Sequence, residues 1–131
     1  MATVKTGDSH EVVVVDDLTR TQLVQYAGAS GDYNPLHTDE VYATKVAGYP
    51  TVFAHGMLTM AMTGRVVTDL FGADNVTRFG ARFVSQVWPG DTLTVTATVG
   101  DITDGVAEVS LSTRNQKGDE VLSGYASAKV G

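Results

Sequence analysis

The stretch Gly56-Met-Leu-Thr-Met-Ala-Met-Thr-Gly-Arg-Val-Val-Thr-Asp-Leu-Phe71 is apolar apart from scattered polar positions. A helix this apolar is mostly buried, because little of its surface is suited to water. Its methionines fit a role as core-filling side chains. We therefore expect one long buried helix over residues 56–71.

Downstream of this helix, four stretches with strand-type composition follow one another. They cover about residues 76–87, 92–99, 106–114 and 120–130, and turn signals separate them at Pro89-Gly90-Asp91, Asp104-Gly105 and Lys117-Gly118-Asp119. Residues 93–99 alternate strictly between apolar and polar, as a strand with one solvated face should. Four strands in series after a helix favour an antiparallel sheet over a βαβ layout.

Upstream of the helix, Glu11–Asp16 contains four consecutive valines and predicts another strand. Thr19 and Gln22 form a capping box, which predicts a short helix through about Ala27. The 131 residues contain no repeat, low-complexity tract or linker, and this length is near the commonest domain size. We expect a single α+β domain over residues 1–131.

Composition excludes several classes of function. Because the chain has no cysteine, disulfides and thiolate catalysis are absent, and its three scattered histidines lack zinc-ligand spacing, so no metal is expected. A net charge of −6 argues against general nucleic-acid binding. The amino terminus has no apolar signal region and no hydrophobic run is long enough to cross a bilayer, so we expect a cytoplasmic protein without membrane insertion.

The segment Gly31-Asp32-Tyr33-Asn34-Pro35-Leu36-His37 contains a candidate acid/base pair. Asn34 is a good N-cap and Pro35 suits the first helical position, so a helix is expected to begin there. His37 then lies in its first turn and Asp32 on the turn just outside, where the two can share proton transfer through one water. Each also has a structural interpretation, because aspartate in such turns often bonds the backbone and a lone histidine is often structural.

The segment Ala54-His55-Gly56-Met57-Leu58 forms the start of the buried helix. Its first backbone N–H groups lack helical partners and lie at the positive end of the helix dipole, which suits them to polarise a carbonyl oxygen. Gly56 has no side chain to block a ligand's approach. Alternatively, Gly56 allows tight packing and His55 caps the helix.

Together, Tyr26-Ala-Gly-Ala-Ser-Gly31-Asp32-Tyr-Asn34-Pro35-Leu36-His37 and Ala54-His55-Gly56-Met57-Leu58 resemble the MaoC-like (R)-specific enoyl-CoA hydratases, also called hydratase 2, and the related (3R)-hydroxyacyl-ACP dehydratase subunits of the HadB type. Arg82-Phe83 and Trp88-Pro89-Gly90-Asp91 extend the resemblance over nearly the whole chain. It implies a hot-dog fold, in which a curved antiparallel sheet of about five strands wraps around one long helix.

The resemblance also implies a reaction, the reversible hydration of trans-2-enoyl thioesters to (3R)-3-hydroxyacyl thioesters in fatty-acid metabolism, without a cofactor. In that reaction Asp32 and His37 would activate the water and exchange the proton, while the backbone N–H of Gly56 would bind the thioester oxygen. Which side chain acts first as base stays open. Asn34 is expected to support the site by fixing the turn, with a role as N-cap alone as the alternative.

Substrate and partner contacts are expected as follows. The acyl pocket is placed between the short helices and the buried helix, with candidate lining residues that are also ordinary core residues: Tyr26, Tyr42, Phe53, Met57 and Met60. The phosphates of CoA or an acyl carrier protein would meet basic residues for which solvated surface charge is the alternative: Arg65, Arg78, Arg82 and Lys117. Because one unit exposes its sheet edges, we expect a homodimer or a heterodimer with another hot-dog subunit.

Two other functions compete with this interpretation. A hot-dog thioesterase would use a carboxylate on or beside the long helix, but that helix carries only Asp69, near its far end. A noncatalytic acyl-binding or partner subunit would be expected to lack Asp32 or His37, and both are present. The sequence therefore favours the hydratase.

Overall fold

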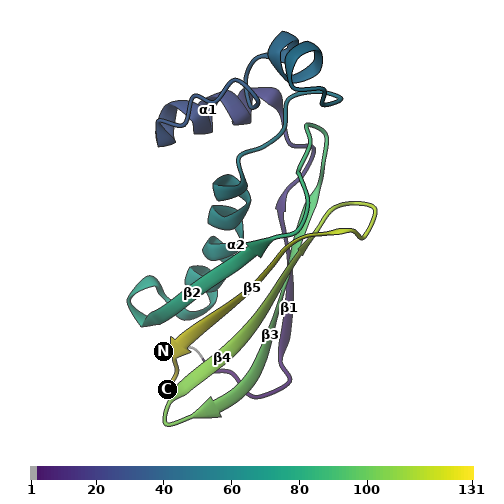
Figure 1. Cartoon of the computed structure of the whole chain (residues 1–131). Helices are drawn as coiled ribbons and strands as arrows, with labels where there is room; N and C mark the ends of the chain where they lie inside the picture. Colours follow the sequence, from purple (N-terminus) through teal and green to yellow (C-terminus); the bar gives the residue numbers. More distant parts are fainter. Residues whose placement is uncertain (1–2) are drawn as a thin grey trace.

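The computed structural model describes residues 3–131, in which five antiparallel strands form one sheet beside a long helix (Figure 1). The strands are β1 (Ser9–Val15), β2 (Val76–Phe83), β3 (Leu93–Thr103), β4 (Val106–Arg114) and β5 (Glu120–Lys129). Their order in the sheet is β1-β3-β4-β5-β2, and every neighbouring pair is antiparallel. Strands β1 and β2 are therefore the two edges.

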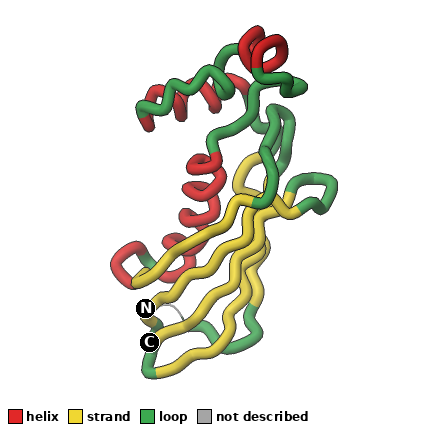
Figure 2. Tube along the Cα trace, viewed as in Figure 1, coloured by secondary structure: helices red, strands yellow, loops and turns green. Residues whose placement is uncertain are grey.

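The long helix α2 (Gly56–Phe71) packs on one face of this sheet, as Figures 1 and 2 show. Val66, Val67 and Phe71 belong to the main core cluster, together with inward-facing residues of the central strands. From Leu93 to Val99 of β3 every second residue is buried, because alternate residues of a strand face opposite sides of the sheet. The predicted buried helix and hot-dog fold are confirmed.

The helix α1 (Arg20–Ser30) begins with the predicted capping box, since Thr19 Oγ1 accepts a bond from the Gln22 N–H and the Gln22 side chain bonds back to Thr19. It continues three residues beyond the predicted end and stops at Gly31, which has a left-handed φ of 77°. Glycine adopts this conformation without steric cost, so the chain turns there into the Asp32 segment.

The prediction that a helix begins at Asn34 is wrong, because only a turn follows it. Asn34 Oδ1 accepts a hydrogen bond from the Leu36 N–H, as a cap should, but Pro35–Thr38 form a single turn. Asp39 Oδ1 then accepts a bond from the Tyr42 N–H. Side chains that bond nearby backbone groups compete with helix propagation, so the turn after Pro35 does not extend into a helix. A separate short helical segment follows Asp39 and contains the π-helix η1 (Tyr42–Val46).

Two strand boundaries also differ from the prediction. Strand β2 ends at Phe83, whereas the sequence predicted a strand through Val87. Beyond Phe83 the Val84 and Ser85 N–H groups both bond the Val121 carbonyl of β5. The chain then leaves the sheet toward the segment before α2, where the Ala54 N–H donates to the Val87 carbonyl at 2.8 Å. Strand β3 runs past Val99 to Thr103 through a register shift, which the alternation pattern did not reveal.

A second core cluster joins the helical lobe to the sheet. Leu23 of α1 and Ala43 of η1 pack with Val52, Val87 and Leu93. As a result α1 and η1 lie beyond one end of the sheet, next to the start of α2 (Figures 1 and 2). A short 3₁₀ helix, η2 (Ala73–Asn75), connects α2 to β2. No helix within residues 3–131 has the length and apolar character needed to cross a bilayer.

Two glycines at the β2–β5 pairing give a stability prediction. A Cβ at Gly124 would lie 2.9 Å from the backbone carbonyl of Gly80, whereas a Cβ at Gly80 would meet the Tyr125 side chain. The side chain can rotate away but the carbonyl cannot move without disturbing the sheet. We expect Gly124→Ala to lower the free energy of unfolding by about 1–3 kcal/mol, and Gly80→Ala by less. Urea unfolding of both variants measures this, and equal losses would contradict the packing described here.

Candidate active site

The loop that carries Asp32 and His37 lies against the first residues of α2. One oxygen or nitrogen atom from each of Asp32, His37 and His55 lies within 4.8 Å of the other two. The His37 ring stacks on the His55 ring, with 3.8 Å between centroids and 24° between planes. The structure therefore brings the predicted carboxylate and imidazole together, immediately before Gly56.

Local hydrogen bonds hold Asp32 in place. Asp32 Oδ1 accepts a bond from the Asn34 N–H at 3.2 Å, and the Asp32 N–H donates to Ser30 Oγ at 3.2 Å. The carbonyl of Asp32 accepts a bond from His55 Nε2 at 3.0 Å. The carboxylate thus closes its own turn and remains exposed to solvent on one side. Asn34 contacts it through the backbone, while the Asn34 side chain caps the next turn.

His37 is oriented through its Nδ1 atom, which lies 2.6 Å from the Phe53 carbonyl. A carbonyl can only accept, so Nδ1 carries the hydrogen and Nε2 carries the lone pair. Burial lowers the pKa of His37, and the neighbouring His55 lowers it further, while the Phe53 carbonyl and Asp32 act in the opposite direction. The net lowering keeps the ring neutral at neutral pH, with Nε2 available to accept a proton.

The helix α2 begins without a side-chain cap, because His55 occupies the N-cap position but directs its ring elsewhere. Within the described residues no hydrogen bond satisfies the N–H groups of Gly56 and Met57. A Cβ at Gly56 would lie 3.1 Å from the Phe83 ring. Any larger residue at this position would therefore press against that ring, whereas glycine fits without a shift. These free donors at the positive end of the helix dipole suit a carbonyl oxygen that gains negative charge.

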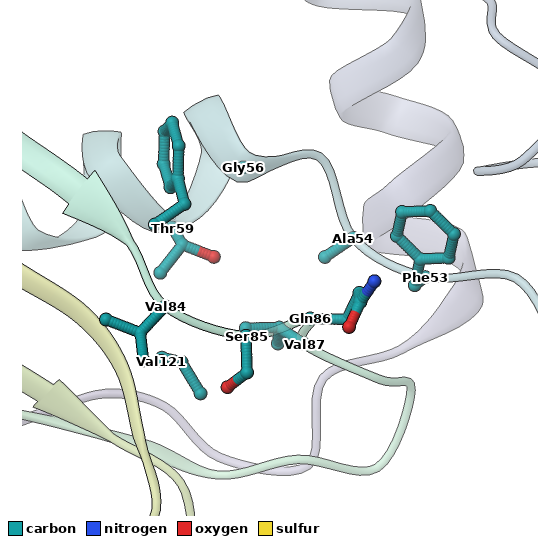
Figure 3. A pocket seen from close by; sticks show the side chains of 10 residues that line it. Phe53, Ala54, Gly56, Thr59, Val84, Ser85, Gln86, Val87 and Val121 are labelled. Carbon is teal, nitrogen blue, oxygen red and sulfur yellow. The ribbon is translucent and has the colours of Figure 1, made fainter.

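A cavity of about 340 Å³ opens beside Gly56. Figure 3 shows Phe53 and Ala54 on the segment that enters α2, with Ser85 and Gln86 across the gap. The full lining comprises Phe53, Ala54, Gly56, Thr59, Phe83, Val84, Ser85, Gln86, Val87 and Val121. The sequence had placed the acyl pocket between the short helices and the buried helix, whereas this cavity lies between residues 53–59 and residues 83–87.

The five predicted acyl-contact residues lie in different places. Phe53 lines the cavity. Tyr26 packs edge-on against His55, with ring centroids 4.9 Å apart, and Met60 packs on the second core cluster. Tyr42 and Met57 are exposed. Thr59, Ser85 and Gln86 also line the cavity and were not predicted: Thr59 had been assigned to the buried helix only, and residues 84–87 to a strand.

The Asp32, His37 and His55 cluster is poorly arranged for a metal ion. Imidazole lone pairs lie in the ring plane, and two stacked rings only 24° from parallel cannot aim them at one ion about 2.1 Å away. His37 Nδ1 and His55 Nε2 are also engaged with carbonyl groups. The arrangement suits proton transfer instead.

The remaining predicted residues lie away from the cavity lining. Asp69, the only acidic residue on α2, is exposed and pairs with Arg65 at 3.7 Å. The Arg78 guanidinium lies over the Tyr125 ring, 4.6 Å from its centroid. Arg82 and Lys117 are exposed. Asp69, the carboxylate that α2 itself carries, does not line the cavity.

The fold and site define a hot-dog protein with an acid/base pair at the start of its central helix. The chain belongs to the MaoC-like family, since the MaoC like domain matches residues 3–121. It is 42% identical over 89 residues to 3-hydroxyacyl-thioester dehydratase Y of Mycobacterium tuberculosis, a match covering 66% of this chain and 31% of that protein. The chain thus spans about a third of the length of this curated relative.

Two solved structures are similar over nearly the whole chain. The R-hydratase PhaJ1 from Pseudomonas aeruginosa superposes with a TM-score of 0.84 at 25% identity, covering 98% of this chain and 84% of that one. A chain of the ChsH1–ChsH2 complex from Mycobacterium tuberculosis gives a TM-score of 0.80 at 20% identity, covering 98% and 100%. The second likeness shows the fold alone.

Proposed function

We propose that this chain catalyses the reversible hydration of trans-2-enoyl thioesters to (3R)-3-hydroxyacyl thioesters in fatty-acid metabolism. The observation that supports this most strongly is that Asp32 and His37 gather around His55, the residue directly before the free N–H groups of Gly56 and Met57 at the start of α2. The cavity beside Gly56 offers space for an acyl chain. The names of the relatives, a thioester dehydratase and an R-hydratase, are consistent with this reaction.

The chemistry accounts for each group. Water loses a proton to a base as its oxygen bonds to C3, and the π electrons move to form an enolate whose negative charge lies on the thioester oxygen. The Gly56 N–H stabilises that oxygen, and the proton returns to C2 as the enolate collapses. Asp32 and His37 accept the proton of the water and deliver a proton to C2, and both steps take place on the same side of the substrate. Either side chain is able to act first, since the His37 ring is neutral and Asp32 lies beside it.

The contacts with the substrate follow from the same placement. Asn34 supports Asp32 through the backbone N–H bond to Oδ1. The acyl chain enters the cavity past Phe53, and Tyr26, Tyr42, Met57 and Met60 remain predicted contacts. CoA and an acyl carrier protein both remain candidate carriers, and a cytoplasmic location and a single domain over residues 1–131 stay predictions.

We also propose that the chain pairs with a second hot-dog subunit along strand β2. This strand is an unpaired edge, and Phe83, Val84 and Met57 near it are 50%, 49% and 56% exposed. Such an apolar patch at the mouth of the cavity is typical of an interface. The ChsH1–ChsH2 complex, which has the same fold, is an assembly of two different proteins. The partner is therefore either another copy or a different subunit, and this chain would be the member that carries Asp32 and His37.

The test is an assay of the purified chain, alone and with a candidate partner, on trans-2-enoyl thioesters of several lengths attached to CoA and to acyl carrier protein. We expect loss of the conjugated-enoyl absorbance and formation of the R alcohol alone. The native mass of the same preparation reports the pairing. Release of free CoA without a hydroxyacyl product would instead identify a thioesterase, and an S product would contradict the proposal.

A further inference from the structure

His55 is a buried histidine that the proposed chemistry does not use. Its side chain is 2% exposed, and it contacts three parts of the site. Its Nε2 atom lies 3.0 Å from the Asp32 carbonyl, its ring stacks on His37 at 3.8 Å, and the Tyr26 ring packs edge-on against it at 4.9 Å. His55 also directly precedes Gly56. It therefore contacts the turn that carries Asp32 and the His37 ring, and it adjoins the start of α2.

The hydrogen bonds define the tautomer of His55. The Asp32 carbonyl can only accept, so Nε2 carries the hydrogen and Nδ1 carries a bare lone pair. That Nδ1 atom is buried and has no hydrogen-bond partner among residues 3–131. Buried polar atoms are normally satisfied, so an apolar side chain would fill this space with less penalty. The retained imidazole therefore calls for an explanation other than core packing.

We propose that His55 is the positioning residue of the acid/base pair. The N–H bond that it donates to the Asp32 carbonyl holds the turn that bears the carboxylate. Its ring forms the wall against which His37 stacks, so that the His37 ring cannot rotate about its Nδ1 bond to Phe53. The inference rests on the proposed function, because it treats Asp32 and His37 as the reacting pair.

The groups around His37 predict a second effect of His55. His37 faces the Asp32 carboxylate, the Phe53 carbonyl and the His55 ring, while Tyr26 of α1 contacts His55. The His55 ring stacked at 3.8 Å covers one face of His37, and burial is the main cause that lowers the pKa of His37. A charge on His55 would act in the same direction. Replacement of His55 by a side chain without a ring should therefore expose His37 and raise its pKa.

Two substitutions separate the contributions of the N–H group and the ring. His55→Phe keeps an aromatic ring beside His37 but lacks the donor to the Asp32 carbonyl. His55→Gln keeps a donor near the position of Nε2 but lacks the ring. His10→Phe is a matched control, because His10 on β1 also has a buried, unpartnered Nε2 and takes no part in the site.

We expect His55→Phe to lower kcat by about 10- to 100-fold with little change in KM, since a displacement of about 1 Å in a catalytic group has an effect of this size. His55→Gln should retain more activity than His55→Phe, and His10→Phe should keep kcat within about twofold of the unaltered chain. In nuclear magnetic resonance spectra, the ¹⁵N shifts should identify Nε2 of His55 as the protonated nitrogen. Titration should show a raised pKa of His37 in His55→Gln.

The proposal is overturned if the unaltered chain is active and His55→Phe keeps its kcat, or if His10→Phe loses as much. The opposite tautomer of His55, or an unchanged pKa of His37 in His55→Gln, also overturns it. The spectroscopic results do not depend on activity and decide the matter even if His55→Phe does not fold. A chain that hydrates no thioester, yet shows the expected tautomer and titration, would contradict the proposed function and leave the positioning of His37 by His55 supported.

Discussion

Asp32→Asn is expected to lower the turnover of a trans-2-enoyl thioester by about 10²- to 10⁴-fold, the usual cost of removing a general acid/base group. Asparagine has nearly the shape of aspartate, and its Oδ1 can still accept the bond from the Asn34 N–H. It cannot accept a proton from water or carry the negative charge. The turn should therefore form as before while proton transfer fails. Steady-state kinetics together with urea unfolding measure both effects.

Asp39→Asn provides a matched control for this substitution. Asp39 also accepts a backbone hydrogen bond, from the Tyr42 N–H, and asparagine caps as well as aspartate does. It lies outside the site, so turnover should stay within about twofold, as is usual for a conservative surface change. If Asp32→Asn keeps its turnover as Asp39→Asn does, the only role of the Asp32 carboxylate is the hydrogen bond that closes its turn.

His37→Ala is expected to produce a loss of similar size and to change the pH dependence. His37 accepts a proton only when its ring is neutral, so kcat/KM of the unaltered chain should fall as the pH decreases through the pKa of His37. Burial and then His55 hold that pKa below the ordinary value of 6.5. The acid limb of the profile should accordingly lie below 6.5 in the unaltered chain.

The pH profile of kcat/KM across the range in which imidazole titrates is the measurement for this prediction. In His37→Ala the limb assigned to His37 should be absent from the residual activity. An acid limb that stays in place after the substitution would assign it to another group. A limb above 6.5 in the unaltered chain would contradict the environment described for His37.

Much of the fold could be predicted from periodicity alone. The apolar run 56–71 coincides with α2, and the alternation in 93–99 predicted the buried face of β3. The sheet order could not be predicted, because β2 pairs with β5 across some forty residues of intervening chain. The end of β2 was also missed. Residues 84–87 keep a strand-like composition, but the Val84 and Ser85 N–H groups share the Val121 carbonyl, and the Val87 carbonyl bonds Ala54 instead of the sheet.

The site was predictable in part, for a physical reason. The sequence placed Asp32 just outside the turn that carries His37, so the two could face one pocket, whereas their distance depended on the folded structure. The place of His55 depends on tertiary packing, which stacks it on His37 and bonds it to the Asp32 carbonyl. This residue had a role only in an alternative interpretation of the sequence, as a helix cap, although a histidine directly before the glycine at a buried helix start is a usable signal.

The central claim is that Asp32, His37 and the Gly56 N–H act on one bound thioester. Its most direct test is a crystal structure of Asp32→Asn with a trans-2-enoyl-CoA bound. We expect the thioester oxygen within hydrogen-bond distance of the Gly56 nitrogen, the C3 atom beside residue 32 and His37, and the acyl chain in the cavity next to Thr59. A thioester bound with its carbonyl turned away from α2, or with C3 remote from His37, would contradict this account.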